Sequence, residues 1–90
     1  MKRAASDSQI IGVVAANVRA ARKAAGLSQE ELAFEAQLDR TYISQVERKQ
    51  RNVTISVLAR IAKALGTTPD RLLVASISPS ASSRSKKRRA

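Results

Sequence analysis

The chain contains no cysteine and no histidine among its 90 residues. Without cysteine there are no disulfides, no cysteine-ligated metal sites and no thiol nucleophiles, and without histidine the commonest general base near neutral pH is missing. No apolar run approaches the length that a membrane-spanning helix needs. The composition therefore argues against an enzyme, a cofactor, a metal and a membrane partner. It favours one soluble cytoplasmic domain.

Aromatic and acidic residues are both scarce. Phe34 and Tyr42 are the only aromatic side chains, which disfavours a surface that stacks successive unpaired bases. The 17 lysine and arginine residues outnumber the 7 acidic ones, which gives a net charge of +10. A charge of that size on a short chain favours a polyanionic partner, with nucleic acid ahead of an anionic membrane.

The net charge is concentrated at the carboxyl end. Half of it falls within residues 76–90, which hold five basic residues and no acidic one. Residues 78–90 are rich in serine and lack an apolar period, so we expect a disordered basic tail. Such a tail is a non-specific DNA-binding arm, a targeting signal or simply a solvated end. We expect residues 1–8 to be flexible and residues 9–77 to form the folded domain.

Apolar residues recur at helical spacing through most of the chain, and no alternation long enough for a strand interrupts them. The sequence therefore predicts an all-α fold with five short helices. The first runs from about Ser8 to Ala25 and ends before Gly26, a residue suited to a left-handed helix end. Its inner stripe is Ile11, Val14, Val18, Ala21 and Ala25.

The next two helices are short and closely linked. Ser28 and Glu31 form a capping box at the start of the second helix, and Asp39 caps a third that runs from Arg40 to about Arg48. Only residues 37–39 separate them, so the two helices must cross steeply. The residues expected to pack inside this angle are Leu32, Ala33, Ala36, Leu38, Ile43 and Val46.

The last two helices have equally clear ends. The fourth begins at the Thr54 cap and stops at Gly66, and its inner stripe is Ile55, Leu58, Ile61, Ala62 and Leu65. Pro69 suits the first turn of a fifth helix capped by Thr68.

The outer face of the third helix is polar and free of acidic residues. Helical spacing brings together Arg40, Thr41, Ser44, Gln45 and Arg48. Arginine, glutamine and threonine are side chains that match base edges in a DNA major groove. The alternative is an ordinary solvated face, because small helical domains always have polar outer faces. The tight turn before this helix favours the DNA-reading interpretation.

A resemblance to a known family covers roughly residues 10–75. The chain resembles the Cro and lambda-repressor-type helix-turn-helix regulators, also called the XRE family, in its series SQEELA, LDRTYIS, VER, RN and LARIAKALG. Within that family it is particularly similar to the small controller proteins of restriction-modification systems, through QLDRTYISQVERKQRN. The resemblance implies a compact five-helix lambda-repressor-like domain and a sequence-specific transcriptional regulator.

The resemblance also implies partners and contacts. The regulator would be a homodimer on a near-palindromic operator in double-stranded DNA, with its reading helices in major grooves roughly 34 Å apart, and it would regulate its own synthesis. Arg40, Thr41 and Gln45 match base-reading positions. The residues expected at or near the DNA backbone are Gln29, Tyr42, Ser44, Arg48, Lys49, Arg51 and Asn52. For Arg51 and Asn52, ordinary loop solvation is the alternative.

Two charged residues occupy inward positions. Arg22 follows Val18 by four residues and Glu47 follows Ile43 by four, so we expect the two to pair. The resemblance likewise implies a partly buried ion pair between the first and third helices. Two unrelated side chains that reach solvent past the core would explain the same pattern.

Further predictions concern dimer contacts and the turn. Four apolar residues near the carboxyl end are candidates for the dimer interface, although the first two could instead close the core: Leu72, Leu73, Val74 and Ile77. Gln37 and Lys49 stand where the family usually has glycine, so both are expected in a less comfortable backbone conformation. This puts the angle of the reading helix in question.

One other class of function fits the same sequence. The helical body could instead be a docking surface in a protein-bridging or RNA-associated module, with the basic tail as its nucleic-acid tether. Deletion of residues 78–90 separates the two hypotheses. A regulator keeps specific DNA binding without the tail, whereas the bridging module loses most of its nucleic-acid binding.

Overall fold

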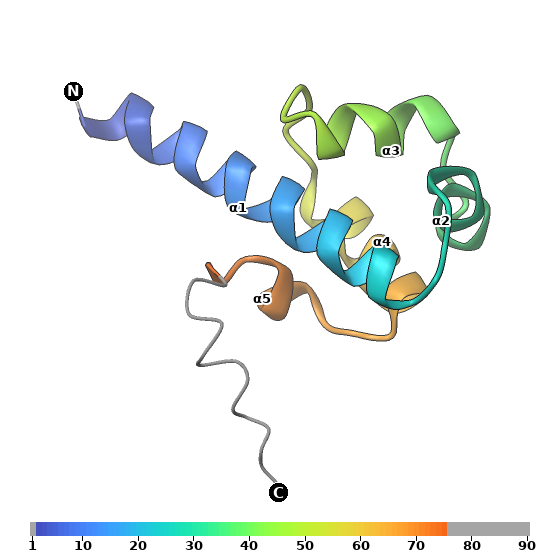
Figure 1. Ribbon diagram of the computed structural model, residues 1–90. Helices are drawn as coiled ribbons and strands as arrows, with labels where there is room; N and C mark the ends of the chain where they lie inside the picture. Colours follow the sequence, from blue (N-terminus) through green and yellow to red (C-terminus); the bar gives the residue numbers. More distant parts are fainter. Residues whose placement is uncertain (1, 76–90) are drawn as a thin grey trace, which may run out of the picture.

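The computed structural model of the protein describes residues 2–75, with side chains from Gln9 onward. Figure 1 shows a long first helix, with the shorter helices gathered around its carboxyl-terminal half. The described chain is helical as predicted, with no strand between residues 2 and 75. The helices are α1 (Lys2–Ala24), α2 (Gln29–Ala36), α3 (Arg40–Glu47), α4 (Ile55–Leu65) and α5 (Pro69–Leu72).

Helix α1 begins earlier than the sequence pattern predicts. It starts at Lys2 rather than Ser8, and neither glycine nor proline occurs in residues 2–8 to stop it. The amino-terminal part of α1 extends beyond the other helices (Figure 1). At its other end Gly26 adopts φ 73°, as the glycine at this position predicted, and Ala25 is exposed because it lies beyond the last helical residue.

Helices α2, α3 and α4 begin at the caps that the sequence indicates. Ser28 accepts from the Glu31 amide at 3.0 Å while the Glu31 carboxylate accepts from the Ser28 amide at 2.8 Å, which completes the capping box. Asp39 accepts from the Thr41 amide at 3.1 Å, and Thr54 accepts from the Val57 amide at 3.2 Å. These bonds satisfy amides that have no partner inside the helix.

Helix α5 departs from its predicted cap. Thr68 precedes the helix, but its side chain makes no capping hydrogen bond to the backbone. Its hydroxyl instead hydrogen bonds to Asp70 and lowers the pKa of that carboxyl group. Pro69 occupies the first turn as predicted.

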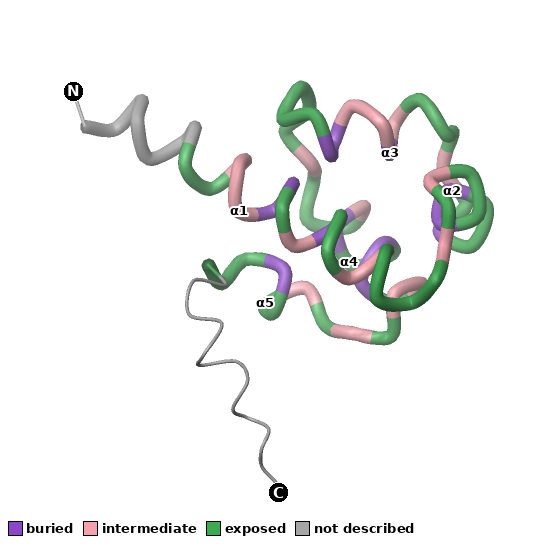
Figure 2. Tube along the Cα trace, in the orientation of Figure 1, coloured by how far each residue is buried: buried purple, intermediate pink, exposed green. Residues whose placement is uncertain are grey.

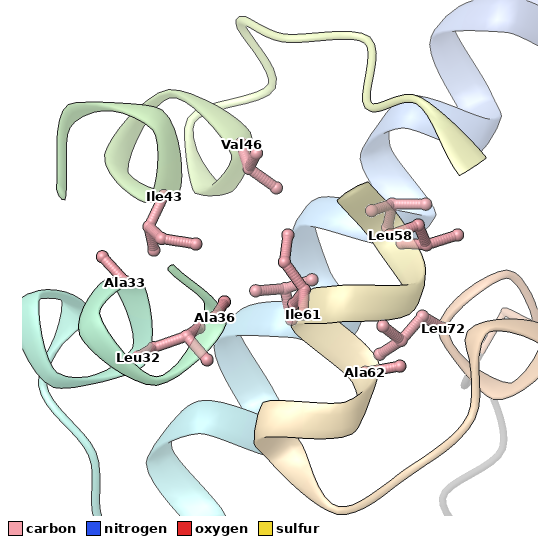
Figure 3. Close-up of a cluster of buried hydrophobic side chains, with 11 residues drawn as sticks. Leu32, Ala33, Ala36, Ile43, Val46, Leu58, Ile61, Ala62 and Leu72 are labelled. Atoms are coloured by element: carbon pink, nitrogen blue, oxygen red, sulfur yellow. The ribbon is translucent and has the colours of Figure 1, made fainter. Parts of the chain in front are cut away.

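The core lies where α1, α2, α3 and α4 face one another, as the buried segments in Figure 2 show. Figure 3 shows side chains from α2, α3 and α4 directed toward a common centre, with Leu72 from α5 at its edge. The predicted packing inside the α2–α3 angle is confirmed: five of the six residues are buried and Leu38 packs partly buried against them. The fully buried large side chains are Val18, Leu32, Ile43, Val46 and Ile61.

Ile55 was predicted to face the core and does not. It is 82% exposed, because it is the first residue of α4 and lies on the outward side of the first turn. The buried stripe of α4 begins one turn later, at Leu58.

Helices α1 to α4 all end with the same pair of backbone hydrogen bonds. In α2, the Leu38 amide bonds to the Ala33 carbonyl at 2.8 Å and the Gln37 amide bonds to the Phe34 carbonyl at 3.1 Å, the Schellman arrangement. This motif needs one left-handed residue, which is glycine in α1 and α4 but Gln37 (φ 61°) and Lys49 (φ 63°) in α2 and α3. Left-handed backbone costs a non-glycine residue about 1–2 kcal/mol.

Candidate nucleic-acid interface

Helices α2 and α3 form the predicted helix-turn-helix. Gln37, Leu38 and Asp39 are the only residues between them, and the left-handed Gln37 reverses the chain at the end of α2. Because Ile43 and Val46 point into the core, the opposite side of α3 faces away from the body. Figure 1 shows α3 at the edge of the molecule, with no other helix covering its outer side.

The outer side of α3 carries the residues that the sequence assigned to it. Arg40, Thr41 and Arg48 are exposed, whereas Ser44 and Gln45 are half-buried. Asp39, which lies beside them, is engaged by the Thr41 amide. The face therefore offers two guanidinium groups, two hydroxyls and an amide, the groups that bond to base edges and phosphates.

Gln45 is joined to Arg51 in the loop after α3. The Gln45 side-chain oxygen accepts from Arg51 Nε at 3.1 Å and from Nη2 at 2.7 Å, and the Arg51 guanidinium carbon lies 4.4 Å from the centre of the Tyr42 ring. Both lone pairs of that oxygen are thus engaged. A two-bond contact between Gln45 and adenine needs this oxygen as an acceptor, so it requires Arg51 to move away.

Arg22 and Glu47 form the predicted ion pair between α1 and α3. Arg22 Nε lies 2.7 Å from Glu47 Oε2 and Nη2 lies 3.0 Å from Oε1, while the third nitrogen donates to the Leu27 carbonyl at 2.8 Å. The two side chains are 12% and 3% exposed. The hydrogen bond to Glu47 and the attraction of its charge raise the pKa of Arg22. The alternative of two unrelated solvated side chains is excluded.

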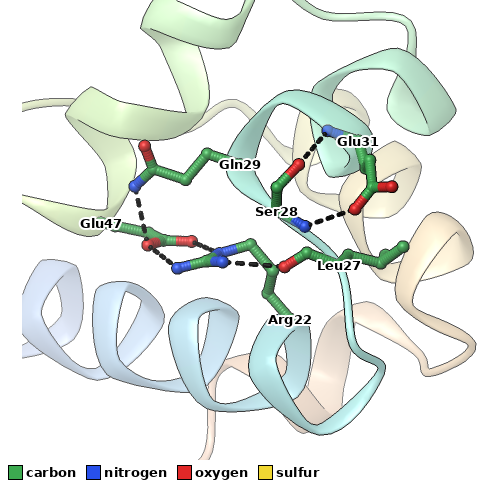
Figure 4. Close-up of polar contacts among 6 residues, drawn as sticks. All are labelled: Arg22, Leu27, Ser28, Gln29, Glu31 and Glu47. Atoms are coloured by element: carbon green, nitrogen blue, oxygen red, sulfur yellow. Dashed lines mark hydrogen bonds and ion pairs between the residues drawn. The ribbon is translucent and has the colours of Figure 1, made fainter.

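Gln29 contacts this ion pair, which the sequence did not indicate. Its amide nitrogen donates to Glu47 Oε1 at 3.0 Å, so Gln29, Glu47 and Arg22 form one chain of polar contacts at the start of α2 (Figure 4). Gln29 is half-buried, and its side-chain oxygen points away from the carboxylate. The predicted DNA-backbone residue is therefore fixed in place by the same carboxylate that links α1 to α3.

Glu31 is engaged at the start of α2. Its carboxylate is turned back into the capping box with Ser28. Phe34 points away from the core and is 81% exposed. With Glu30 and Glu35, which are also exposed, it borders a shallow surface hollow, and no role follows from these contacts.

Lys49 and Asn52, two further predicted backbone contacts, lie beyond the end of α3. Both are exposed. The Lys49 stem passes over Gly12 of α1, where an added β-carbon would be 3.8 Å from Lys49 Cδ. Lys49 therefore lies beside α1 rather than in line with the outer face of α3.

The predicted dimer residues divide between the core and the surface. Leu72 is 2% exposed and belongs to the core, so its assignment to the dimer interface is corrected to the alternative of core closure. Leu73 and Val74 are 43% and 62% exposed, and Leu73 borders an apolar cavity of about 80 Å³ together with Ile10. Ile77 lies outside the described residues, as does the predicted basic tail.

Two long-range contacts escaped the sequence altogether. Asn17 Nδ2 donates to the carbonyls of Leu72 and Val74, each at 2.9 Å, and so holds the end of α5 against α1. Arg60 of α4 donates to the carbonyls of Ala36 and Gln37 at the end of α2. Each is a polar residue on a helix surface, and no local pattern marks its distant partner.

Residues 18–72 match a protein family described as Helix-turn-helix. The chain belongs to this family. The match covers most of the described body, from the middle of α1 to the end of α5. The helix-turn-helix family is one of DNA-binding transcriptional regulators, so the expectation that the chain is not an enzyme is confirmed.

Several relatives within the helix-turn-helix family are controller proteins. The control protein C.SmaI of Serratia marcescens is 54% identical over 61 residues, which are 68% of this chain and 73% of the relative. The crystal structure of the restriction-modification controller C.AhdI from Aeromonas hydrophila matches with a TM-score of 0.67 and 44% identity, over 69% of this chain and 94% of that one. The predicted resemblance to such controllers is thereby confirmed.

A third relative has been solved on DNA. The restriction-modification controller C.Esp1396I, as a tetramer in complex with its natural 35 base-pair operator, matches with a TM-score of 0.65 and 38% identity. The match covers 70% of this chain and 83% of that one.

Within residues 2–75 of the present chain, no helix is long and apolar enough to cross a membrane.

Proposed function

We propose that the protein is a dimeric, sequence-specific regulator of transcription that binds a near-palindromic site in double-stranded DNA. The observation that carries the proposal is the outer face of α3, which is polar, free of unpaired acidic groups and uncovered by the described body. It belongs to a helix-turn-helix whose relatives include a controller solved on its operator. With DNA as its partner, the protein would act in the cytoplasm.

The charges near α3 support phosphate binding. The four cations of α3 and the following loop are Arg40, Arg48, Lys49 and Arg51. The two acidic groups in the same stretch are both engaged, Asp39 in its cap and Glu47 in its ion pair. The exposed acids Glu30 and Glu35 border a separate hollow beside Phe34. Arg40, Arg48 and Arg51 therefore give the side that α3 presents a positive potential.

In the proposed mechanism, each protomer is positioned by phosphate contacts and reads bases through α3. Gln29 would bind a phosphate from the start of α2, where backbone amides and the helix dipole also favour an anion. Arg40 would bond to the two acceptors of a guanine, and Thr41 would place its methyl group against thymine. Gln45 would read adenine once Arg51 has moved to the DNA, which leaves the amide oxygen of Gln45 free.

Dimerisation would set the spacing of the two half-sites. Two copies of α3 in successive major grooves lie roughly 34 Å apart, and the exposed Leu73 and Val74 supply apolar surface beside the axis. The controller relatives favour a role in the control of a restriction-modification system, with the protein acting on its own promoter by occupancy of the operator.

Selection of binding sites from random duplexes tests the proposal. We expect a symmetric consensus and an affinity that falls about 10³- to 10⁵-fold between 50 and 200 mM salt, since a dimer neutralises some 6–10 phosphates. Equal affinity for a scrambled duplex would contradict it.

Deletion of residues 78–90 tests the alternative of a protein-bridging or RNA-associated module. A regulator that reads DNA through α3 keeps its preference for the selected site, with weaker binding to all duplexes. Loss of nearly all nucleic-acid binding would favour the bridging module instead, because the tail would then be its tether.

A further inference from the structure

The turn between α2 and α3 depends on a backbone conformation that its own sequence disfavours. Gln37 has φ 61° and ψ 45°, which glycine adopts freely and glutamine does not. The corresponding residues after α1 and α4 are Gly26 and Gly66. The turn that fixes the direction of α3 thus lacks the glycine that could adopt this conformation at little cost in free energy.

Arg60 compensates for this at a distance of 23 residues along the chain. From α4, its Nε donates to the Ala36 carbonyl at 3.2 Å and its Nη2 donates to the Gln37 carbonyl. Both carbonyls lie at the end of α2, where no helical amide remains to bond them. A guanidinium with fixed geometry across two successive carbonyls fixes the peptide planes on both sides of Gln37.

No comparable contact supports the other left-handed non-glycine residue. Within residues 9–75, no side chain donates to the backbone carbonyls at the end of α3 near Lys49. Of the two left-handed residues that are not glycine, only Gln37 therefore has such a clamp within the described side chains. Arg60 lies on α4 and is exposed, on the side where α4 meets the end of α2.

We propose that Arg60 is a positioning residue for DNA recognition, which acts by holding Gln37 in its left-handed conformation. This inference rests on the proposed function. The clamp fixes the angle between α2, which carries Gln29, and α3, which carries the base readers. Without the clamp, the angle varies, and the phosphate contact of α2 and the base contacts of α3 no longer form together on one duplex. Discrimination between sites should then fall more than overall affinity.

Three variants of the full chain test the proposal on the selected operator and a scrambled duplex: Arg60→Met, Gln37→Gly and the two combined. Arg60→Met removes the donors and keeps the stem, and we expect the ratio of operator to scrambled affinity to fall about tenfold, which is about 1.4 kcal/mol of discrimination. Adding Gln37→Gly to Arg60→Met should restore the ratio to within about twofold of Gln37→Gly alone, because glycine needs no clamp.

Two matched controls separate this role from general stabilisation and from charge. Lys49→Gly combined with Arg60→Met relieves the same backbone strain at the end of α3, and it should leave the discrimination low. Lys63→Met removes a neighbouring exposed cation of α4, and it should keep the ratio near wild type.

Hydrogen exchange distinguishes failure of this inference from failure of the proposed function. The Leu38 amide bonds across the turn, and Arg60→Met should accelerate its exchange while the amides in α1 stay protected.

If Arg60→Met keeps full discrimination, or if Lys49→Gly rescues as well as Gln37→Gly, the inference is overturned. If Arg60→Met does not fold, Arg60→Lys takes its place, since it keeps a cationic donor on a single nitrogen. Its loss of discrimination should be smaller, and again only Gln37→Gly should restore the ratio. A wild-type chain without any preferred duplex refutes the proposed function, and Leu38 exchange then still reports whether Arg60 holds the turn.

Discussion

The Glu47 carboxylate lies between Arg22 and Gln29 and accepts hydrogen bonds from both. One buried group on α3 is thereby tied to α1 and to the start of α2. An arginine is charged throughout the ordinary pH range, and this contact raises the pKa of Arg22 further. Removal of the carboxylate would leave a largely buried cation without a counter-charge.

Glu47→Ala should therefore lower the free energy of unfolding by about 3–5 kcal/mol, the cost of stranding one member of a buried ion pair. In a domain of this size, that corresponds to a decrease in Tm of more than roughly 10 °C. Thermal unfolding followed by circular dichroism measures it. Glu35→Ala, an exposed acid on α2, is the control and should change little. A decrease in Tm of only a degree or two for Glu47→Ala would show that the pair does not matter.

Arg40→Ala should weaken binding to the selected operator by about 1–3 kcal/mol and relax the preference at one guanine per half-site. Arg40 is exposed at the start of α3, so its truncation should leave Tm unchanged. Repeating the site selection with the variant measures both effects. A uniform loss across all sequences would mean that Arg40 contacts phosphate rather than a base.

Arg51→Ala should affect two contacts in opposite ways. It removes one phosphate contact per protomer, which weakens binding to every duplex. The slope of log affinity against log salt should therefore become shallower by about 1 per protomer bound. It also frees the Gln45 oxygen that Arg51 occupies, so preference for adenine at one position should sharpen. Arg71→Ala on α5 is the matched loss of a cation. An unchanged salt slope for Arg51→Ala would leave Arg51 as a solvated loop residue.

Lys49→Gly should stabilise the fold by about 1 kcal/mol, because it relieves left-handed backbone strain without removing a buried contact. Gly66→Ala is the mirror-image control. Gly66 has φ 76° with open space around it, so this variant should lose stability through its backbone alone. Chemical denaturation measures both midpoints, and a destabilised Lys49→Gly would point to a role of the lysine stem against Gly12.

Leu72, the last residue of α5, and Leu73, which follows it, should give different phenotypes. Leu73→Asp places a charge on an exposed apolar position and should reduce the dimer fraction in sedimentation velocity with little change in monomer stability. Leu72→Ala should cost about 2–5 kcal/mol of stability through the cavity that it leaves. A Leu73→Asp protein that dimerises like the wild type would place the dimer interface elsewhere.

The sequence was most informative where structure is decided locally. Ser28, Asp39 and Thr54 cap helices because their side chains reach amides two or three residues away. The left-handed Gln37 was expected because it stands where the resembled family usually has glycine. The Arg22–Glu47 pair was predicted from two interruptions of apolar stripes, a signal that is itself local.

Contacts between distant segments were harder to predict. Periodicity placed Ile55 in the core, although the first residue of a helix can extend past its neighbours. The alternatives for Leu72 stayed open because burial depends on what α1 and α4 cover. The partners of Asn17, Arg51 and Arg60 are backbone carbonyls or a side chain reached only after folding, and neither composition nor spacing records them.

Because Arg60 supports the Gln37 turn, the residue that is tolerated at position 37 should depend on the residue at position 60. Where a relative has glycine at the turn, the arginine on α4 is free to drift. Where the turn residue is not glycine, loss of the arginine should leave the left-handed turn without support and make it less stable. Positions 37 and 60 should therefore vary together among related chains, and an exchange of the reading helix between two such proteins should succeed best when α4 is carried along with it.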